Sequence, residues 1–180
     1  MKIFKKKKQE ISIYNKLKNF IDQEQKIYII FEKVENKDKN IEGLEKAFFD
    51  FFSKDKKALT EFDTYFRDHE FEEIKDKFQN FLFSIENIEY QRFPGLSILL
   101  MRNSFCKETV KLGIYLCRFY PLENHRTAIK ILADLALLEE FRKPSLDALK
   151  NLGIFELVRD SIYRKIENIE IEEKYEIRKA

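Results

Sequence analysis

The chain has 180 residues, of which 44% are hydrophobic and 37% are charged, and its net charge is +2. This composition excludes a disordered or fibrous chain, and the length suits one domain or two small lobes that share a core. No uncharged apolar run approaches the ~18 residues that a membrane span needs, and the first residues lack the pattern of a secretory signal. We therefore expect a cytoplasmic protein.

The N-terminal segment, residues 1–9, is strongly basic, and we expect a flexible, solvated tail. Contact with a membrane surface is an alternative, because Ile3 and Phe4 would insert while the lysines meet anionic headgroups. Contact with nucleic acid is a third interpretation. A single cluster of charge without a second anchor attaches weakly, which favours the solvated tail. The lysines of this cluster are Lys5, Lys6, Lys7 and Lys8.

From residue 10 onward, hydrophobic residues return every three or four positions, and this spacing predicts helices. The first stripe predicts one long helix over about 10–35, although its second half, 26–34, is rich in β-branched and aromatic residues and is alternatively a strand. Amphipathic stripes follow at 41–52, 59–66 and 70–90. Acidic residues outnumber basic ones in this part of the chain, so we expect residues 10–92 to form an acidic helical lobe.

The sequence Phe93-Pro94-Gly95 is the strongest break in the chain, and it predicts a soft boundary between two lobes. The second lobe, residues 93–180, is more apolar and mildly basic. Lys143-Pro144-Ser145 is expected to separate two of its helices, and Asn124 to cap one of them. Gly113 would let another backbone approach closely. The predicted helices of this lobe are 96–105, 107–119, 125–142, 146–152 and 154–175.

These patterns predict an all-α fold. Several helices are apolar on more than one face and joined by short loops, so they need neighbours on both sides. We expect a multi-helix bundle or a short α-solenoid-like array of seven to nine helices. The sequence contains no second copy of any segment at a fixed period, so no repeat family is predicted.

Basic residues gather in the second lobe. Lys107, Lys111 and Arg118 lie within about 40° of one another on a helix, and Arg126 and Lys130 form a pair spaced i, i+4. One hypothesis is a patch, completed by Arg102, that grips nucleic acid or an acidic partner. The alternative is that these side chains form solvent edges and pair with nearby carboxylates, and we favour this alternative. The carboxylates that it invokes are Glu123, Asp134, Glu139 and Glu140.

Catalytic, metal and cofactor motifs are missing from the sequence, which gives no support for an enzyme and predicts no cofactor. His69 has carboxylates at i+3 and i+4 but lacks the repeated Glu-x-x-His pattern of a metal bundle, so we expect a surface residue. His125 follows the expected cap. Cys106 and Cys117 lie about 16 Å apart on one predicted helix, too far for a disulfide, so both are expected to be reduced.

The cluster AFFDFF at residues 47–52 places three of its phenylalanines on one face, whereas Phe49 points elsewhere. Phe49 is therefore a candidate protein contact. Together with the abundant amphipathic helices, this leads to the hypothesis of a non-catalytic interaction or adaptor protein that binds another protein. The alternatives are a nucleic-acid-binding accessory protein that uses the basic residues of 102–159, and an enzyme or ligand binder with an apolar pocket between helices.

Overall fold

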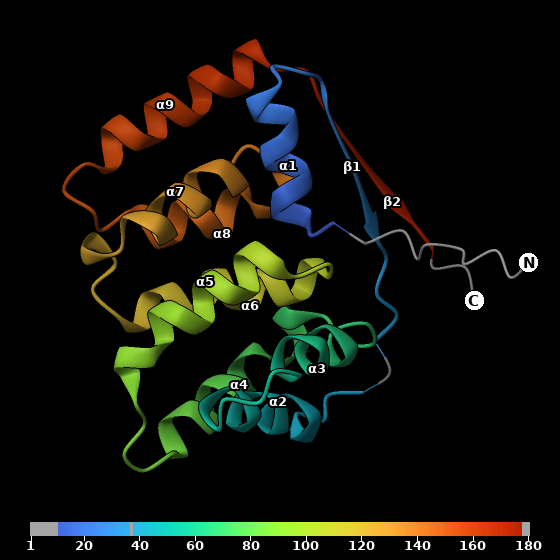
Figure 1. Cartoon of the computed structure of the whole chain (residues 1–180), viewed down its shortest axis with the longest axis vertical. Helices are drawn as coiled ribbons and strands as arrows, with labels where there is room; N and C mark the ends of the chain where they lie inside the picture. The colour runs from blue at the N-terminus through green and yellow to red at the C-terminus, as the bar shows by residue number, and fades with distance from the viewer. Residues whose placement is uncertain (1–10, 37, 178–180) are drawn as a thin grey trace, which may run out of the picture.

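The structure, a computed structural model, describes residues 11–36 and 38–177 (Figure 1). In this part of the chain, nine α-helices account for most of the structure and two strands form one small sheet, so the predicted all-α class is confirmed. The first elements are α1 (Ile13–Asp22), β1 (Ile27–Glu32), α2 (Glu42–Phe52), α3 (Ala58–Tyr65) and α4 (Phe71–Ser84). After them come α5 (Phe93–Asn103), α6 (Lys107–Leu116), α7 (Arg126–Leu135), α8 (Glu139–Leu149), α9 (Phe155–Asn168) and β2 (Ile171–Glu176). The basic tail, with Lys5 to Lys8, lies outside the described residues.

The helices stack in two layers, in the manner of a short solenoid. In one layer α5 contacts α3 and α7, and α7 contacts α9; in the other, α6 contacts α4 and α8. The pairs α5–α6 and α7–α8 join the layers. Figure 1 shows the stack rising from α2, α3 and α4 through α5 and α6 to α7, α8 and α9, with α1 at one side.

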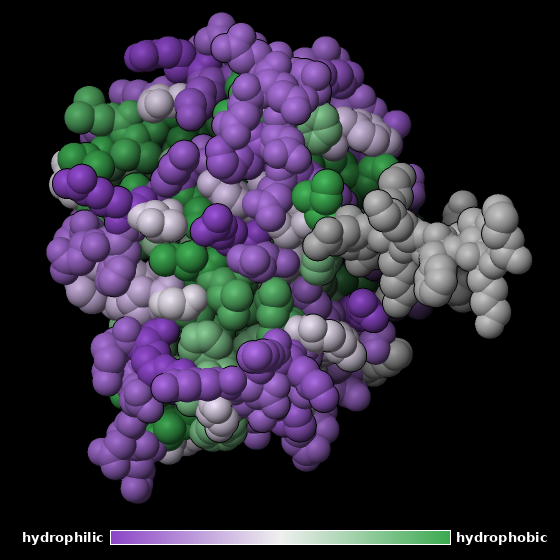
Figure 2. Space-filling view, in the orientation of Figure 1, coloured by the Kyte–Doolittle hydropathy of each residue, from purple (hydrophilic) through white to green (hydrophobic). Residues whose placement is uncertain are grey.

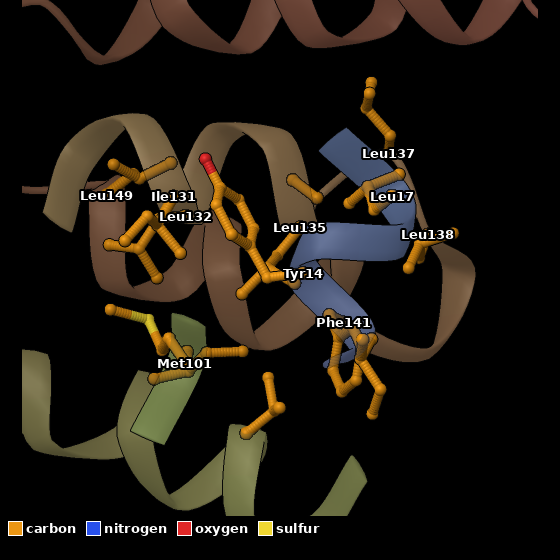
Figure 3. Close-up of a cluster of buried hydrophobic side chains, with 14 of the residues drawn as sticks. Tyr14, Leu17, Met101, Ile131, Leu132, Leu135, Leu137, Leu138, Phe141 and Leu149 are labelled. Carbon is orange, nitrogen blue, oxygen red and sulfur yellow. The ribbon is translucent and has the colours of Figure 1, made fainter. Parts of the chain in front are cut away.

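Two hydrophobic clusters fill the interior, and they meet along α5 and α6. The first cluster contains phenylalanine side chains of α2, α3 and α4. The second contains apolar side chains of α1, β1, α7 and α8. Figure 3 shows Tyr14 and Leu17 of α1 packed among leucines of α7 and α8. On α5, Leu100 belongs to the first cluster and Met101 to the second. The predicted boundary near 92–95 thus falls at the start of a helix whose side chains serve both clusters, and the division into lobes stays a prediction.

The predicted long helix over 10–35 is wrong in its second half, where the alternative interpretation as a strand is correct. Helix α1 ends at Asp22, and Glu24 adopts a positive φ of 53° that turns the chain. In β1 the side chains alternate between core and solvent, with Ile27, Ile29 and Phe31 buried. This alternation is the period of a strand, and the same residues also match a helical stripe over so short a window.

The partner of β1 is β2, which runs parallel to it in register from Ile27 opposite Ile171 to Glu32 opposite Glu176. The predicted helix 154–175 is therefore too long: α9 ends at Asn168. Sequence spacing does not reveal this pairing, because the two strands come from opposite ends of the chain.

The predicted helix 125–142 is two helices, and Pro144 does not separate helices but lies inside α8. The chain turns instead at Ala136-Leu137-Leu138, three buried apolar residues that carry no turn signal. The N-cap position of the first helix of this pair is His125 and not Asn124, and the His125 side chain makes no capping hydrogen bond. The prediction for Gly113 is confirmed, since a Cβ there would lie 2.9 Å from the backbone nitrogen of Met101.

The surface is mainly hydrophilic, with hydrophobic residues exposed across the middle, over α5, and where α9 begins (Figure 2). The exposed hydrophobic residues near the start of α9 include Ile154 and Leu157. Within the residues that the structure describes, no helix combines the length and the apolar character needed to cross a bilayer.

Candidate functional site

A groove runs along α6 and α8, with α4 at one side. Its first hollow has a volume of about 430 Å³ and an apolar floor that includes Ile114, Pro144 and Ala148. A second hollow of about 470 Å³ also borders Arg118, Asp147 and Ala148, so the two hollows adjoin. We call the adjoining hollows together the α6–α8 groove. Each volume lies in the range of ligand pockets, and the lining combines a small apolar part with many charged side chains.

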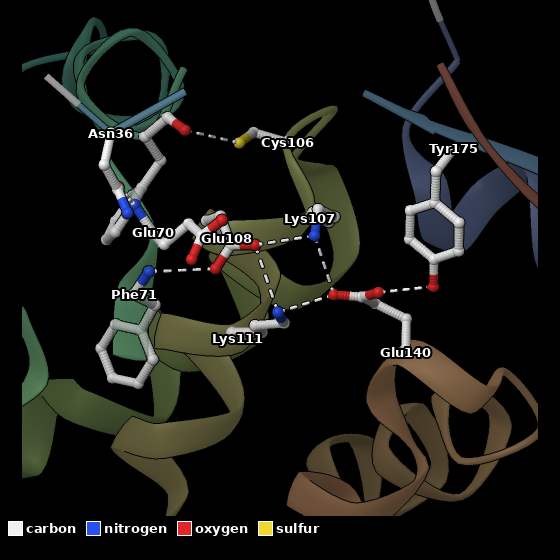
Figure 4. Close-up of polar contacts among 10 residues, drawn as sticks. Asn36, Glu70, Phe71, Cys106, Lys107, Glu108, Lys111, Glu140 and Tyr175 are labelled. Atoms are coloured by element: carbon white, nitrogen blue, oxygen red, sulfur yellow. Dashed lines mark hydrogen bonds and ion pairs between the residues drawn. The ribbon is translucent and has the colours of Figure 1, made fainter. Parts of the chain in front are cut away.

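A buried carboxylate organises the end of the groove where α6 begins. Glu108 is only 1% exposed, and burial of a carboxylate is costly unless it has partners. The backbone N–H of Phe71, at the start of α4, donates to it at 3.0 Å. The ammonium groups of Lys107 and Lys111 lie 3.0 and 3.2 Å from its other oxygen (Figure 4). Glu108 therefore ties α4 to α6.

Both lysines also contact Glu140 on α8, at 3.0 Å from Lys107 and 2.6 Å from Lys111. The hydroxyl of Tyr175, in β2, donates to the same carboxylate at 2.6 Å. Burial raises the pKa of Glu140, but the hydrogen bonds from Lys111, Tyr175 and Lys107 outweigh it and lower the pKa to about 2. For Lys111, burial lowers the pKa, while Glu108 and Glu140 raise it above its ordinary value. The network joins α4, α6, α8 and β2.

Strand β2 also fixes the first turn of α8. The carboxylate of Glu173 accepts hydrogen bonds from the backbone N–H groups of Glu139 and Glu140. These N–H groups have no partner inside the helix, and a carboxylate is favourable at this end of the helix dipole. The wall of the groove that α8 forms is thus held by a residue from the far end of the chain.

The six predicted basic residues lie on three α-helices and on the short 3₁₀ turn at residues 117–119 that follows α6. Lys107 and Lys111 are engaged with Glu108 and Glu140, which agrees with the favoured interpretation that they pair with carboxylates. Arg118 is exposed at the edge of the groove, with its guanidinium 4.5 Å from the centre of the Tyr115 ring. The remaining three lie elsewhere: Arg102 in the last turn of α5, Arg126 beside a separate hollow at the start of α7, and Lys130 on α7.

The predicted protein contact Phe49 is 48% exposed on α2. Its ring makes edge contacts with Phe48 and Phe81 at centroid distances of 6.2 and 5.6 Å. Its role in binding stays a prediction.

The histidines are engaged with neighbouring residues. His69 is half-buried rather than freely exposed at the surface: its side chain is 13% exposed, its ring stacks on Tyr65, and Nε2 lies 3.2 Å from Asp38. His125 packs edge-on against Tyr120. Across the described ranges, no group of three or more histidines, cysteines and carboxylates has the arrangement of a metal site.

Both cysteines are free, as predicted. Cys106 and Cys117 flank α6 at its two ends, and burial raises the pKa of each thiol to about 11. At neutral pH both are therefore protonated and poor nucleophiles.

Sequence reasoning missed Glu108, Glu173 and Tyr175. The sequence does hold a signal for Glu108: it lies between Lys107 and Lys111 on a helix that is predicted to be largely apolar, so a pairing of this carboxylate with the two lysines could have been expected. The other two lie in the segment that was predicted to be helical, and their role depends on the pairing of β1 with β2. Comparisons of the chain with protein-family models, curated proteins and solved structures gave no match.

Proposed function

We propose that the protein is a non-catalytic interaction protein that binds another protein through the α6–α8 groove. One observation carries the proposal: around the apolar floor, Arg118, Glu139, Lys143 and Asp147 have no ion-pair partner among the described residues. A polar rim around an apolar centre is the usual anatomy of a protein interface, and charges that lack a partner within the chain are available to one. Stacked helical arrays commonly bind proteins along such a face.

Arg118 indicates what a partner would bring to the groove. Its guanidinium lies over the ring of Tyr115, whose hydroxyl donates to Gln79 at 2.6 Å. The guanidinium group is planar and offers paired donors that match a carboxylate. We therefore expect a carboxylate of the partner opposite Arg118, with apolar side chains over the floor.

The alternatives have less support. Lys107 and Lys111, which the nucleic-acid hypothesis requires, each already contact two carboxylates. His69 and His125, which an enzyme would most readily use, do not line the groove. We also propose a cytoplasmic location, which the two free cysteines support because thiols stay reduced there.

Co-purification from the native host tests the proposal. Tagged wild type should retain a partner that the Arg118→Glu variant loses. The substitution would place a carboxylate of this chain opposite the carboxylate that we expect from the partner, and the two would repel each other. Arg126→Glu is the matched control, since Arg126 is also an exposed arginine but borders a different hollow. Equal recovery of the partner by all three proteins would refute a binding role for the groove.

A further inference from the structure

The exposed face of α8 carries a stripe of alternating charge. The stripe consists of Glu139, Lys143 and Asp147 on α8 and of Lys150, the C-cap residue that directly follows the helix. They are spaced by four, four and three residues, so they span only about 80° around the helix axis. All four are exposed. Residues at i and i+4 with opposite charge commonly pair along a helix. Here, neither Glu139 with Lys143 nor Lys143 with Asp147 forms an ion pair, and none of the four has one with any other described residue.

The order of these charges makes the stripe complementary to itself. Read from Glu139 it is minus, plus, minus, plus; read in the opposite direction it is plus, minus, plus, minus. An identical helix lying antiparallel would therefore meet an opposite charge at every position. Glu139 would face the partner's Lys150, and Lys143 would face the partner's Asp147, with each pair formed twice about a two-fold axis. A parallel arrangement would place like charges together.

The stripe borders the groove. The two-fold axis would cross α8 at the level of Pro144, and Pro144 and Ala148, which are both half-buried, lie beside the stripe on the side that lines the groove. The two hollows that share Asp147 and Ala148 would receive side chains of the partner. Arg118 borders the same hollow as Lys150, so the carboxylate expected opposite it would be the partner's Glu139.

From this complementarity we infer that the occupant of the α6–α8 groove is a second copy of this chain, bound with α8 antiparallel to its counterpart. The inference rests on the proposed function, because it names the partner of the same face. It predicts a symmetric dimer whose stability falls as salt screens the paired charges.

Charge reversal gives a decisive test by sedimentation equilibrium of the purified chain at low and high salt. Wild type should be a dimer at low salt. Lys143→Glu and Asp147→Lys should each weaken the dimer by at least about tenfold, because either substitution creates two facing pairs of like charge. The double variant, with both substitutions, should dimerise again. An equal mixture of the two single variants should form the heterodimer, in which every facing pair is again opposite.

Arg126→Glu serves as the control for charge reversal outside the stripe and should dimerise like wild type. Far-ultraviolet circular dichroism confirms that each variant is folded, which is expected because both substituted side chains are exposed. A monomeric wild type at low salt and high concentration would overturn the inference, and so would single variants that dimerise normally. Those results would leave the proposed function standing, since it is judged separately by whether Arg118→Glu loses a partner from the host.

Discussion

Of the four glycines, Gly113 is the one where an added Cβ would meet the closest contacts, and Gly113→Ala tests how α5 packs on α6. A Cβ at residue 113 would lie 2.9 Å from both the backbone nitrogen and the Cγ of Met101, and 3.0 Å from the Cβ of Leu100. Met101 can shift its side chain, but its backbone nitrogen is fixed by α5. The two helices would therefore have to separate by a few tenths of an ångström.

The expected magnitude combines two opposing effects. Replacing glycine by alanine inside a helix stabilises it by about 1 kcal/mol, because the unfolded chain loses freedom. Overpacking of a filled core costs about 1–3 kcal/mol. Because the contact is with backbone and all three neighbouring atoms lie at 3.0 Å or less, we place the cost at the upper end, which gives a net loss of about 1–2 kcal/mol.

Gly95→Ala is the matched control. Gly95 also lies in a helix, α5, but a Cβ there would meet nothing within 4 Å. This variant should gain about 0.5–1 kcal/mol from the same helix preference. Urea unfolding followed by circular dichroism measures both, since the chain has no tryptophan to report by fluorescence. If Gly113→Ala proves as stabilising as Gly95→Ala, the close approach of α5 and α6 is wrong.

Three further predictions concern buried charge. Glu108→Ala should lower the free energy of unfolding by about 3–5 kcal/mol, measured in urea, because two lysines lose their buried counter-ion. The folded pKa of Glu140, about 2, lies below its ordinary 4.5, so its contribution to stability is full above about pH 4.5 and is lost as the pH falls through 2. The difference in stability between wild type and Glu140→Gln should shrink over that range. Tyr14→Phe should cost about 1–3 kcal/mol, because Asp134 loses a buried hydrogen bond of 3.0 Å.

Each of these predictions has a control or a result that contradicts it. Glu156→Ala removes an exposed carboxylate paired with Arg159, and it should change stability by less than about 1 kcal/mol. A similar small loss for Glu108→Ala would mean that its charge is solvated. A pH-independent difference for Glu140→Gln would contradict the low pKa, and a neutral Tyr14→Phe would show that water replaces the phenol.

The helical class was predictable because spacing of apolar residues is a local property. Helix α6 begins at the predicted residue, Lys107, and its close contact at Gly113 followed from the placement of a glycine in an apolar helix. The turn at 136–138 was not predictable, because its residues are apolar and buried and resemble helix interior. Pro144 is tolerated in α8, so a residue that usually ends helices gave the wrong boundary.

The candidate site was predictable only in part, because it depends on contacts between distant segments. That Lys107 and Lys111 would pair with carboxylates was foreseen, and Glu140 was among those considered. The buried position of Glu108 was not, because the neighbour that buries it, the start of α4 at Phe71, lies 37 residues away.

The two-stranded sheet is small, yet it sets the geometry of the groove. Pairing with β1 places β2 where Glu173 accepts the first N–H groups of α8 and Tyr175 reaches Glu140. Because β1 is anchored in the core by Phe31, whose ring packs edge-on against Phe141 of α8, the sheet holds this helix from two directions. The wall that carries the charged stripe is therefore positioned by strands from both ends of the chain. Segments far apart in the sequence therefore brace the wall of the groove, although every residue that lines the groove lies between residues 71 and 152.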